Sequence, residues 1–598
     1  MENNPHNPLP PEQLNSLVDL LRLRAEFTPD APAYREFSPS QGWHSYRWAE
    51  LAADVARWQS ALQAMALNPG DRVAIMLRNC VDWVRFDQAA LGLGLVVVPL
   101  YMQDRPENSA YVLNNSGARL LFLESAEQWQ MIAATGHLRE QLQQVVIQNG
   151  DSVGSETDHP RITPLSDWLD QPAGALQCQV TDPDTLATIQ YTSGTTGRPK
   201  GVMLSHGNIL SNIIAVDRLV SLYSNDLLLS FLPLSHGLER TAGYYVPIYT
   251  GSEVAFSRGT SFLTEDLQQV RPTVLISVPR IFERVDNAIR DKLAGKPALL
   301  ARLFEYTVGL GWREFEYQQG LAGRPAGRWL LTPLLKLFAR PVLKALGGRL
   351  RFAVCGGAPL AAGVARTFTA LGLPLLQGYG LTETSPIISG NPPEANRPHS
   401  VGRIIPGVEV MIGESDEILC RGPNVMLGYW NNPQATEAAV DSQGWFHTGD
   451  CGRLEDDRLF ITGRLKEIIV LANGEKVPPS GMEQAIDRDP LIEQSMVIGE
   501  GKPYLAALVV VSTEELARLN RQRDQPFTIT GEALNQEILR RVTHAIAEFP
   551  GYAKIYRVAC SDEPWEVDNG LVTPTLKIKR AAVESRFANQ IQDLYAGH

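Results

Sequence analysis

Short runs of β-branched and aliphatic residues alternate with stretches of helical spacing over the first three quarters of the chain. "DRVAIML" (71–77) and "LVVVPLY" (95–101) are typical of strands, and residues 79–94 between them repeat their apolar positions at helical spacing. The same pattern returns in "TVLISVPR" (273–280), where we expect a helix from Ile281, and in "LRFAVCGGAPL" (350–360). This alternation predicts an α/β fold with layered sheets covered by helices.

The pattern changes twice toward the C-terminus. After about residue 400, short strands separated by turn residues predict a small β-barrel-like subdomain. A third pattern of mixed strands and helices fills the last 130 or so residues, behind the charged connection "GRLKEIIVLANGEKV". We therefore expect a large domain over 1–462, β-rich over about 400–462, then a hinge at 463–468 and a mobile α+β domain over 469–598.

Two apolar stretches raise the question of a membrane. "ALGLGLVVVPLYM" (90–102) is too short to span a bilayer and is interpreted as a helix end, a turn and a core strand. Residues 296–349 carry apolar positions at helical spacing with Arg and Lys between them. They predict either two surface helices packed on the body of the protein or a basic amphipathic patch that rests on a membrane.

Composition narrows the function classes. The chain has 598 residues, a net charge of -12 and a polar N-terminus without a signal-peptide pattern. The acidic balance argues against binding to nucleic acid, which would need a basic face. Six scattered cysteines without metal-ligand spacing indicate reduced thiols, and Cys355, before a glycine turn, is interpreted as a packing residue.

The stretch "YTSGTTGRPKG" (191–201) is the strongest chemical signal. Glycines and hydroxyl residues after a strand present several N–H and O–H donors to one point, and Lys200 adds a positive charge, which suits phosphate oxygens. It is not a Walker A loop, because Pro199 precedes Lys200 and Gly201 follows it. "VMLSHGNILSN" continues as a strand and a helix that we expect Ser205 to cap, so the loop lies between core elements.

Further motifs follow in a fixed order: "GGAP" (356–359), "QGYGLTET" (377–384), "GWFHTGD" (444–450), "GRLKEII" (463–469) and "LVTPTLKIKR" (571–580). With the glycine-hydroxyl loop, they resemble the signatures of the adenylate-forming enzymes, which include acyl-CoA synthetases, adenylation domains and luciferases. The resemblance covers nearly the whole chain. "PLSHGLERT" (233–241), the 296–349 segment and the "TPTLKIKR" ending are similar to long-chain fatty acyl-CoA synthetases in particular.

The resemblance implies a site assembled from distant motifs. The β- and γ-phosphates of ATP would be held by Thr192, Ser193, Gly194, Thr195, Thr196, Gly197 and Lys200. Thr382 would bond the α-phosphate, and Glu383 would hold Mg²⁺. The adenine and ribose would contact Gly356, Gly357, Ala358, Tyr379, Gly380, Asp450 and Arg464. Lys577 would bridge the carboxylate and the α-phosphate, and Lys476 matches a basic position near the nucleotide only loosely.

The implied reaction has two half-reactions. Attack of a fatty carboxylate on ATP gives an acyl-adenylate and pyrophosphate, and the CoA thiol then displaces AMP. Because Lys577 lies more than 120 residues beyond Asp450, the C-terminal domain must close over the nucleotide. The resemblance implies a second closure that admits CoA, with Lys466 at the hinge.

Alternatives remain open at several residues. His236 is expected either at the acyl pocket or as a satisfied core histidine, and Glu239 and Arg240 are expected to pair at the surface. Asp450 and Glu383 are alternatively caps of a helix or turn, and Lys577 part of a solvated basic run. A regulator without catalysis would predict changed charges, yet Glu383, Asp450, Arg464 and Lys577 are all present.

Within the enzymes, the rivals are a fatty acyl-AMP ligase, an acyl-[acyl carrier protein] synthetase and a luciferase-type oxygenase, although nothing points to a luciferin pocket. The expected partners are fatty acid, ATP and CoA, without nucleic acid, in a cytoplasmic protein that either stays free or touches the inner face of a membrane through 296–349. A homodimer is a further expectation. The sequence does not define the preferred chain length.

Overall fold

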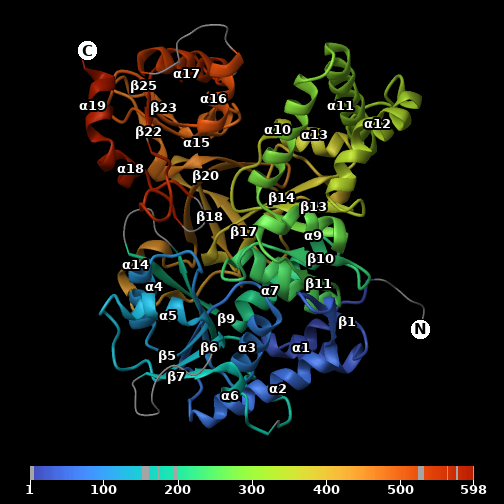
Figure 1. Cartoon of the computed structure of the whole chain (residues 1–598), viewed down its shortest axis with the longest axis vertical. Helices are drawn as coiled ribbons and strands as arrows, with labels where there is room; N and C mark the ends of the chain where they lie inside the picture. The colour runs from blue at the N-terminus through green and yellow to red at the C-terminus, as the bar shows by residue number, and fades with distance from the viewer. Residues whose placement is uncertain are drawn as a thin grey trace.

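The computed structural model describes residues 6–150, 160–172, 174–192, 198–522, 531–547, 549–551, 553–561, 563–573 and 577–596. Two large sheets form most of the chain, and a smaller domain contains the C-terminal elements (Figure 1). The layered α/β architecture expected from the alternating pattern is confirmed.

The larger sheet joins the α/β part to the β-rich part in a single ladder. Its parallel strands, from β1 through β11, β10, β12 and β13 to β14, are mostly buried, as expected for a sheet covered on both faces. From β14 onward the pairing is antiparallel, so the β-rich subdomain continues the sheet. Its order is β17 (Glu409–Ile412), β18 (Glu417–Arg421), β20 (Phe446–Glu455), β21 (Arg458–Arg464), β16 (Gly402–Ile404), β15 (Ile387–Gly390), β14 (Leu375–Gly380), β13 (Phe352–Cys355), β12 (Val274–Ser277), β10 (Leu227–Ser230), β11 (Glu253–Phe256), β1 (Pro32–Ser38) and β2 (Gly42–Arg47).

The second sheet carries the glycine-hydroxyl loop. Its strands are parallel except at one edge, where β8, β9 and β19 pair antiparallel. Residues 193–197 therefore connect the two strands of a hairpin. The order is β19 (Gly428–Tyr429), β9 (Lys200–Ser205), β8 (Leu186–Thr192), β4 (Val96–Pro99), β3 (Arg72–Met76), β5 (Ala118–Ser125), β6 (Gln144–Asn149) and β7 (Arg161–Pro164).

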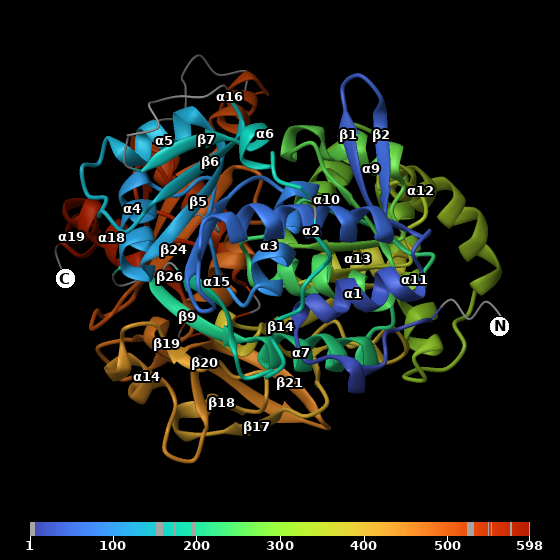
Figure 2. The same cartoon turned by 90° about the horizontal axis from the view of Figure 1, so that it is seen from below.

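A layer of helices lies between the two sheets and shares one apolar core with both (Figure 2). Ser205 caps the buried helix α7 as expected, since its hydroxyl accepts a hydrogen bond from the Asn208 amide at 3.0 Å. The layer contains α1 (Leu17–Phe27), α2 (Trp48–Ala64), α3 (Val81–Gly92), α7 (His206–Leu219), the π-helix η2 (Glu239–Tyr245) and α8 (Val246–Thr250).

The outer faces of both sheets are covered by further helices. The second sheet carries α4 (Pro106–Ser116) and α5 (Ala126–Ala133), and the short α6 (Leu165–Trp168) follows β7. The larger sheet carries α9 (Leu263–Val270), α10 (Pro279–Ala294) and α13 (Ala362–Ala370), and α14 (Pro433–Ala439) follows β19. The expected start of α10 at Ile281 is wrong by two residues, because Pro279 is suited to the first helical turn.

Two helices project beyond the layers. They are α11 (Ala298–Gln318) and α12 (Leu331–Ala345), and α12 is preceded by the 3₁₀ turn η4 (Arg328–Leu330). Phe304 of α11 packs against Phe338 of α12, and both helices form a small apolar cluster with α13. Figure 1 shows α11 and α12 at the edge of the molecule, so the expectation of two packed surface helices describes their structure.

The C-terminal domain has a three-stranded sheet with an apolar cluster on each face. This sheet consists of β24 (Ile492–Ile498), β25 (Leu505–Val511) and β26 (Ile555–Ser561). A separate two-stranded ladder consists of β22 (Ile469–Val470) and β23 (Lys476–Val477). Its helices are α15 (Pro479–Ile486), α16 (Thr513–Gln522), α17 (Gly531–Ala545), α18 (Arg580–Arg586) and α19 (Ala588–Tyr595).

Two expectations from composition can be compared with the structure. No disulfide joins any of the six cysteines, all of which lie in the described ranges, and Cys355 is buried on β13, where burial raises the pKa of its thiol. None of the helices in the described ranges has both the length and the apolar character needed to cross a bilayer.

Candidate active site

A β-hairpin brings the first two site residues together. In the β20–β21 ladder, Asp450 lies opposite Arg464, and its Oδ1 accepts a charged hydrogen bond from Arg464 Nε at 2.9 Å. The other carboxylate oxygen accepts a hydrogen bond from the hydroxyl of Tyr379, at the end of β14, at 2.7 Å. The Asp450 carboxylate therefore joins Tyr379, 71 residues earlier in the sequence, and Arg464, 14 residues later.

Burial shapes the electrostatics of this cluster. Asp450 is 4% exposed, and burial raises its pKa, while Arg464, the Tyr379 hydroxyl and Lys577 act in the opposite direction. Burial, and next the Asp450 charge, raise the pKa of Tyr379 well above its ordinary value. The tyrosine therefore stays a hydrogen-bond donor, and its hydroxyl keeps the carboxylate in place.

A second cluster links the phosphate-loop hairpin to the "TET" motif. Glu383 lies in the 3₁₀ turn η5 (Thr382–Thr384), and its Oε1 accepts a hydrogen bond from the Tyr429 hydroxyl at 2.8 Å. The Lys200 ammonium lies 4.8 Å from the centre of the same tyrosine ring. Tyr429 therefore links the two charges at the β9–β19 edge, with its ring against Lys200 and its hydroxyl bonded to Glu383.

The glycine-hydroxyl loop is described only at its two ends. Thr192 and Lys200 face each other across the β8–β9 ladder, whereas Ser193, Gly194, Thr195, Thr196 and Gly197 lie outside the described residues. Just beyond them, the Arg198 guanidinium lies 5.4 Å from the centre of the Tyr111 ring on α4. This contact links Arg198, just after the loop, to α4 on the outer face of the second sheet.

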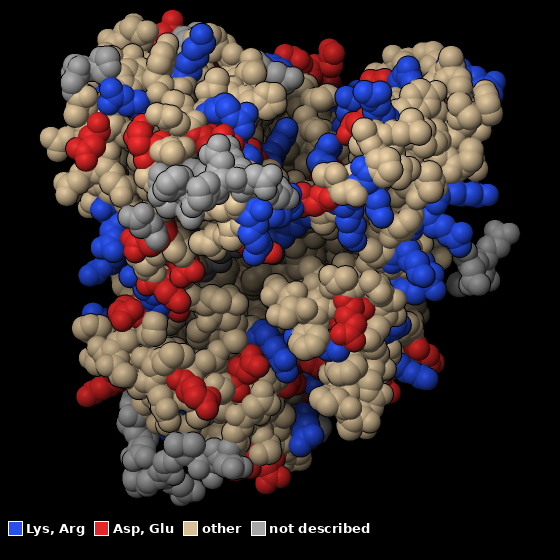
Figure 3. All heavy atoms as spheres, turned by 45° about the horizontal axis from the view of Figure 1, so that its top comes forward, with Lys and Arg blue, Asp and Glu red and all other residues tan. Residues whose placement is uncertain are grey.

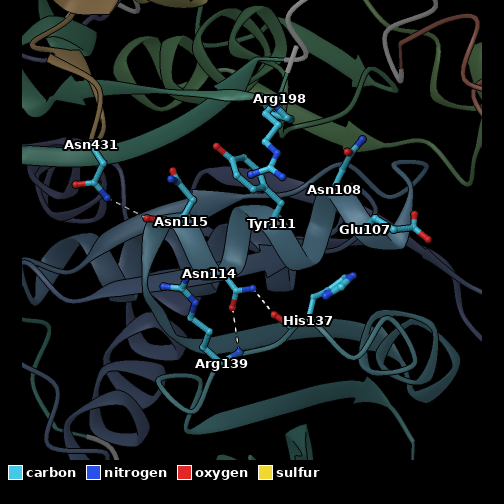
Figure 4. A pocket seen from close by; sticks show the side chains of 10 residues that line it. Glu107, Asn108, Tyr111, Asn114, Asn115, His137, Arg139, Arg198 and Asn431 are labelled. Carbon is cyan, nitrogen blue, oxygen red and sulfur yellow. Dashed lines mark hydrogen bonds between the residues drawn. The ribbon is translucent and has the colours of Figure 1, made fainter. Parts of the chain in front are cut away.

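A pocket of about 740 Å³ opens beside that anchor (Figure 4). Arg198 reaches across it toward Tyr111, while the side chain of Asn114 bonds to the backbone of His137 and Arg139. The pocket lies on the outer face of α4, and its wall contains neither Glu383 nor Asp450. It is therefore distinct from the clusters around those two carboxylates.

Glycines at two strand ends keep the backbone close to the site. Gly356 and Gly357 follow β13, and Gly357 has a φ of +80°, which favours glycine over other residues. Ala358 is exposed at the same turn. Gly380 ends β14, and a Cβ on it would lie 1.7 Å from the carbonyl oxygen of Pro386, so only glycine fits this approach of β14 to β15.

Lys577 reaches the same region from the C-terminal domain. The acidic groups that act on its ammonium are Asp450, Glu467 and Glu383, while burial first, and then Arg464, lower its pKa. Lys577 therefore lies within electrostatic range of both carboxylate clusters, so the C-terminal domain covers this region in the structure. Figure 3 shows this face hollowed between the C-terminal domain and the rest of the chain, with Lys and Arg side chains around the hollow.

The hinge position lies directly behind Arg464. Lys466 occupies the short 3₁₀ turn η8 (Leu465–Glu467), which leads from β21 into the C-terminal domain. Lys476 is exposed on β23, and its backbone lies opposite Val470 in the antiparallel β22–β23 ladder. Neither position is tested by the geometry, so the hinge at 463–468 and its flanking domain limits remain predictions.

His236 lies at the edge of the cleft. Its Nδ1 accepts a 3.3 Å hydrogen bond from the Leu238 amide, and burial, followed by the Lys577 charge, lowers its pKa to about 4. The imidazole is therefore neutral near pH 7 and lies close to Lys577. The side chain of Leu238 packs against Gly356, and a Cβ added to Gly356 would lie 3.0 Å from the Leu238 Cδ2 atom.

The expected surface pair of Glu239 and Arg240 is wrong. Both residues lie in the π-helix η2 and are almost completely buried, and Arg240 pairs with Asp87 of α3 at 2.5 Å. Arg240 also donates to the Thr188 hydroxyl on β8 at 2.8 Å, so it ties η2 to two other elements. Burial raises the pKa of Glu239 to about 8, the nearby Ser230 hydroxyl acts in the opposite direction, and within the described ranges neither carboxyl oxygen meets a donor at full hydrogen-bond geometry.

Sequence reasoning missed two members of the site. The sequence pattern indicates only a short strand around Tyr429, because its contact with Glu383 depends on the pairing of β19 with β9. Glu467 was part of the "GRLKEII" motif, but its effect on Lys577 depends on domain closure. A tyrosine in an otherwise apolar strand was the available signal for the first, and none was available for the second.

The donor set suits a nucleotide with its cation. No cluster of three His, Cys, Asp or Glu side chains that could hold a metal alone occurs in the described ranges. A single carboxylate at Glu383, beside Lys200, fits a Mg²⁺ ion that takes its other ligands from phosphate oxygens and water.

Two segments of the chain match models of known protein families. Residues 21–430 match the AMP-binding enzyme family, and residues 466–598 match the AMP-binding enzyme C-terminal domain. A long-chain-fatty-acid–CoA ligase of Mycobacterium bovis is 33% identical over 92% of both chains. The long chain acyl-CoA synthetase 7 of Arabidopsis thaliana is 30% identical over 93% of this chain and 82% of its own length.

Solved structures share the fold. An anthranilate CoA ligase in complex with anthranoyl-AMP aligns over 98% of this chain and 100% of its own, with a TM-score of 0.74 at 19% identity. The adenylation domain of a carboxylate reductase from Mycobacterium chelonae aligns over 97% of this chain and 91% of its own, with a TM-score of 0.75 at 23% identity. With matches to both domains and a cleft formed between them, this chain belongs to the AMP-binding, adenylate-forming enzymes.

Proposed function

We propose that this chain is a long-chain fatty acid–CoA ligase, which activates a fatty acid with ATP and passes the acyl group from the adenylate to CoA. The observation that carries the proposal is the convergence of Asp450, Arg464 and Lys577, from two domains, on one cleft. The printed names of the relatives from Mycobacterium bovis and Arabidopsis thaliana support the choice of substrate and acceptor.

The chemistry explains why cations gather here. A thiol cannot displace oxide from a carboxylate, whereas AMP is a good leaving group once the carboxylate has attacked the α-phosphorus. Negative charge develops on phosphate oxygens during that attack, and positioned cations stabilise it most where water is excluded. Lys577, held between both carboxylate clusters, would bridge the fatty carboxylate and the α-phosphate.

The nucleotide roles follow from position. The carboxylate of Asp450, held by Arg464 and Tyr379, would accept hydrogen bonds from the ribose hydroxyls. The backbone of 356–358 and the Tyr379 ring would enclose the adenine. Thr382, next to Glu383, would bond the α-phosphate, and Thr192 and Lys200 would flank the β- and γ-phosphates together with residues 193–197.

Glu383 would hold Mg²⁺ together with the phosphates of ATP. The bound ion would neutralise charge on the phosphate oxygens. The hydroxyl of Tyr429 donates to one oxygen of the Glu383 carboxylate, and the other oxygen would bind the ion. Loss of that hydrogen bond should raise the Mg²⁺ concentration needed for half-maximal activity and leave the fold intact.

The acceptor of the acyl group is the main alternative. A relative from Arabidopsis thaliana, 27% identical over 92% of this chain and 82% of its own length, is named a long-chain-fatty-acid–[acyl-carrier-protein] ligase. A ligase that uses a carrier protein, or one that stops at the adenylate, would share the adenylation site. Only the second half-reaction separates these enzymes.

The deciding experiment measures pyrophosphate release with fatty acids of increasing chain length, without acceptor, with CoA and with acyl carrier protein. We expect release with every acid that binds, multiple turnovers with CoA, and a maximum among long chains. Turnover that needs the carrier protein would favour the alternative, and no pyrophosphate release from any acid would overturn the proposal.

Substitution of Lys577 tests the assigned role. Lys577→Ala should slow acyl-adenylate formation by about 100- to 1000-fold, because a cation at the developing charge is lost. Thioester formation from supplied acyl-adenylate should remain within a few-fold of the wild-type rate. Lys554→Ala, at an exposed lysine of the same domain, serves as control. Equal loss of both half-reactions in the Lys577 variant would contradict the role.

Two expectations about the assembled protein are part of this proposal and depend on solution measurements. The chain is expected to reside in the cytoplasm, where its thiols stay reduced, and to form a homodimer, which light scattering would detect. Contact of residues 296–349 with the inner face of a membrane is a further expectation, which sedimentation with lipid vesicles would detect.

A further inference from the structure

Strand β20 departs from regular pairing within the "HTGD" stretch (447–450). In the antiparallel ladder that it forms with β18, His447 lies opposite Leu419 and Cys451 lies opposite Glu417. Residues 417–419 therefore face residues 447–451, so β20 carries two extra residues at this point. Such a bulge bends its strand and changes the direction of the side chains that it carries.

Two amides inside this bulge bond to side chains. The Gly449 N–H donates to Oε1 of Glu417 at 3.0 Å, and the Asp450 N–H donates to the Thr448 hydroxyl at 3.1 Å. That hydroxyl donates in turn to the carbonyl oxygen of Ile418 on β18 at 2.7 Å. Gly449 has a φ of +70°, which favours glycine. The path of the backbone into Asp450 therefore depends on side-chain contacts with β18.

Glu417 uses both of its carboxylate oxygens on the bulge. While Oε1 accepts from the Gly449 amide, Oε2 lies 2.9 Å from Nδ1 of His447, at the start of the bulge. A carboxylate only accepts, so the imidazole donates to it through Nδ1–H. The Glu417 side chain is 14% exposed, and that of His447 is 39% exposed. One partly buried carboxylate thus holds the first residue and the middle of the bulge together.

The residue that follows is the buried carboxylate of the candidate site. Asp450 comes directly after Gly449, and its two oxygens accept from Arg464 Nε at 2.9 Å and from the Tyr379 hydroxyl at 2.7 Å. These bonds need a short and directed approach, so a shift of the bulge would move the carboxylate away from both partners. Glu417 is the side chain of β18 that is placed to prevent this shift.

We infer that Glu417 and His447 are positioning residues for Asp450. They act through the Gly449 backbone, and they set the place at which the Asp450 carboxylate would meet the ribose hydroxyls of ATP. The inference rests on the proposed function, which gives Asp450 the ribose. It adds two side chains, on β18 and at the start of the bulge, on which nucleotide affinity depends.

A plain ion pair between strands is the competing explanation. Glu409 and Arg421 form such a pair across the neighbouring β17–β18 ladder at 2.7 Å, and their side chains are 61% and 41% exposed. Exposed pairs of this kind contribute little. Glu417 differs because it also accepts from a backbone amide of the bulge. Glu409→Ala is therefore the matched control, since it removes a cross-strand carboxylate of the same subdomain away from the bulge.

Binding of AMP, measured by titration calorimetry, tests the inference without catalysis. Glu417→Ala should raise the Kd at least about tenfold, because both hydrogen bonds to the bulge are lost. Glu417→Gln should stay within about threefold, since an amide oxygen still accepts from Gly449 and its NH₂ group can donate to the other tautomer of His447. His447→Ala, which removes one of the two bonds, should fall between them. Glu409→Ala should match wild type.

The ribose supplies a measurement that general damage to the fold would not change in the same way. Wild-type protein should prefer AMP over 2′,3′-dideoxyadenosine monophosphate by at least about tenfold, because the analogue leaves the Asp450 carboxylate without a donor. Glu417→Ala should reduce this preference below about threefold and bind the analogue as wild type does. In steady state, the KM for ATP should rise while kcat stays within about threefold, as for a contact kept from ground state to transition state.

The outcomes separate this inference from the proposed function. A full preference for AMP in Glu417→Ala and His447→Ala, or an equal loss for both nucleotides, would overturn the positioning role alone. A wild type that binds AMP without preferring it to the analogue would remove the ribose role of Asp450, and the inference with it. A wild type that binds neither AMP nor ATP would contradict the proposed function. Thermal unfolding verifies the fold of each variant, and His447→Ala decides if Glu417→Ala does not fold.

Discussion

At the scale of single residues, adjacent positions in η2 show how burial decides the state of a charge. Arg240 keeps its charge because Asp87 accepts from it at 2.5 Å and the hydroxyls of Tyr244 and Tyr245 satisfy the other carboxylate oxygen. Glu239, one residue earlier, has no such partner, and its pKa rises to about 8. Glu239 is therefore a neutral acid near pH 7, whereas Arg240 and Asp87 form an internal ion pair.

Glu239→Gln should remove a pH dependence from stability. The folded pKa of about 8 exceeds the ordinary 4.5, so Glu239 contributes stability below pH 4.5 that is lost as pH rises to about 8. Relative to wild type, the glutamine variant should gain roughly 1 kcal/mol per pH unit between pH 5 and 8 and then level off. Denaturant unfolding of both proteins from pH 5 to 9 measures the difference.

The matched control for this measurement is Glu532→Gln, at an exposed carboxyl on α17. Its stability should follow wild type at every pH, because an exposed carboxyl has nearly the same environment in both states. A constant difference between Glu239→Gln and wild type across the whole range would mean that Glu239 is ionised in the folded protein.

At the scale of elements, the β14–β15 pair shows how closely the backbone approaches itself beside Tyr379. The register shifts between Tyr379 and Gly380, and a Cβ at Gly380 would meet the Pro386 carbonyl oxygen at 1.7 Å. Since backbone atoms cannot move aside like a flexible side chain, the strands would have to separate. The hydroxyl of Tyr379 would then shift away from Asp450.

Gly380→Ala should therefore lower both stability and adenylation. We expect a loss of about 1–3 kcal/mol in the free energy of unfolding, as for other overpacked sites, and at least tenfold slower pyrophosphate release. Gly309→Ala on α11 is the matched control, because no atom lies within 4 Å of the added methyl group. That variant should be neutral or slightly more stable. Unchanged adenylation in Gly380→Ala would show that Tyr379 keeps its position without this close approach.

The same elements show what the sequence could predict. Periodicity and turn residues indicated β12, β13 and the Ser205 cap, since each depends on neighbours in the chain. The motifs named Asp450 and Arg464, but their pairing depends on the β20–β21 register. The contact of Tyr429 with Glu383 and the burial of Glu239 arise from long-range packing, which local patterns do not contain.

At the scale of the whole molecule, the C-terminal domain rests on the large domain at several points. Lys577 lies near Glu383 and Asp450, Lys579 is near Asp104 and Arg105, and a Cβ on Gly570 would touch Arg105. These contacts accompany the closure that brings Lys577 to the cleft. CoA needs a second arrangement if one domain serves both half-reactions, and the turn η8 is the short connection through which the domain would rotate.

Lys466→Pro should separate the half-reactions. Proline suits the φ of a 3₁₀ turn, so the closed arrangement and adenylation should stay within about threefold of wild type. Rotation requires this backbone to change, and proline fixes its own φ, so transfer to CoA should fall by at least about 100-fold. Lys466→Ala, which removes the side chain but leaves the backbone free, should keep both rates. Pre-steady-state measurement of adenylate and thioester separates the steps, and a proline variant that makes acyl-CoA at the wild-type rate would place the hinge elsewhere.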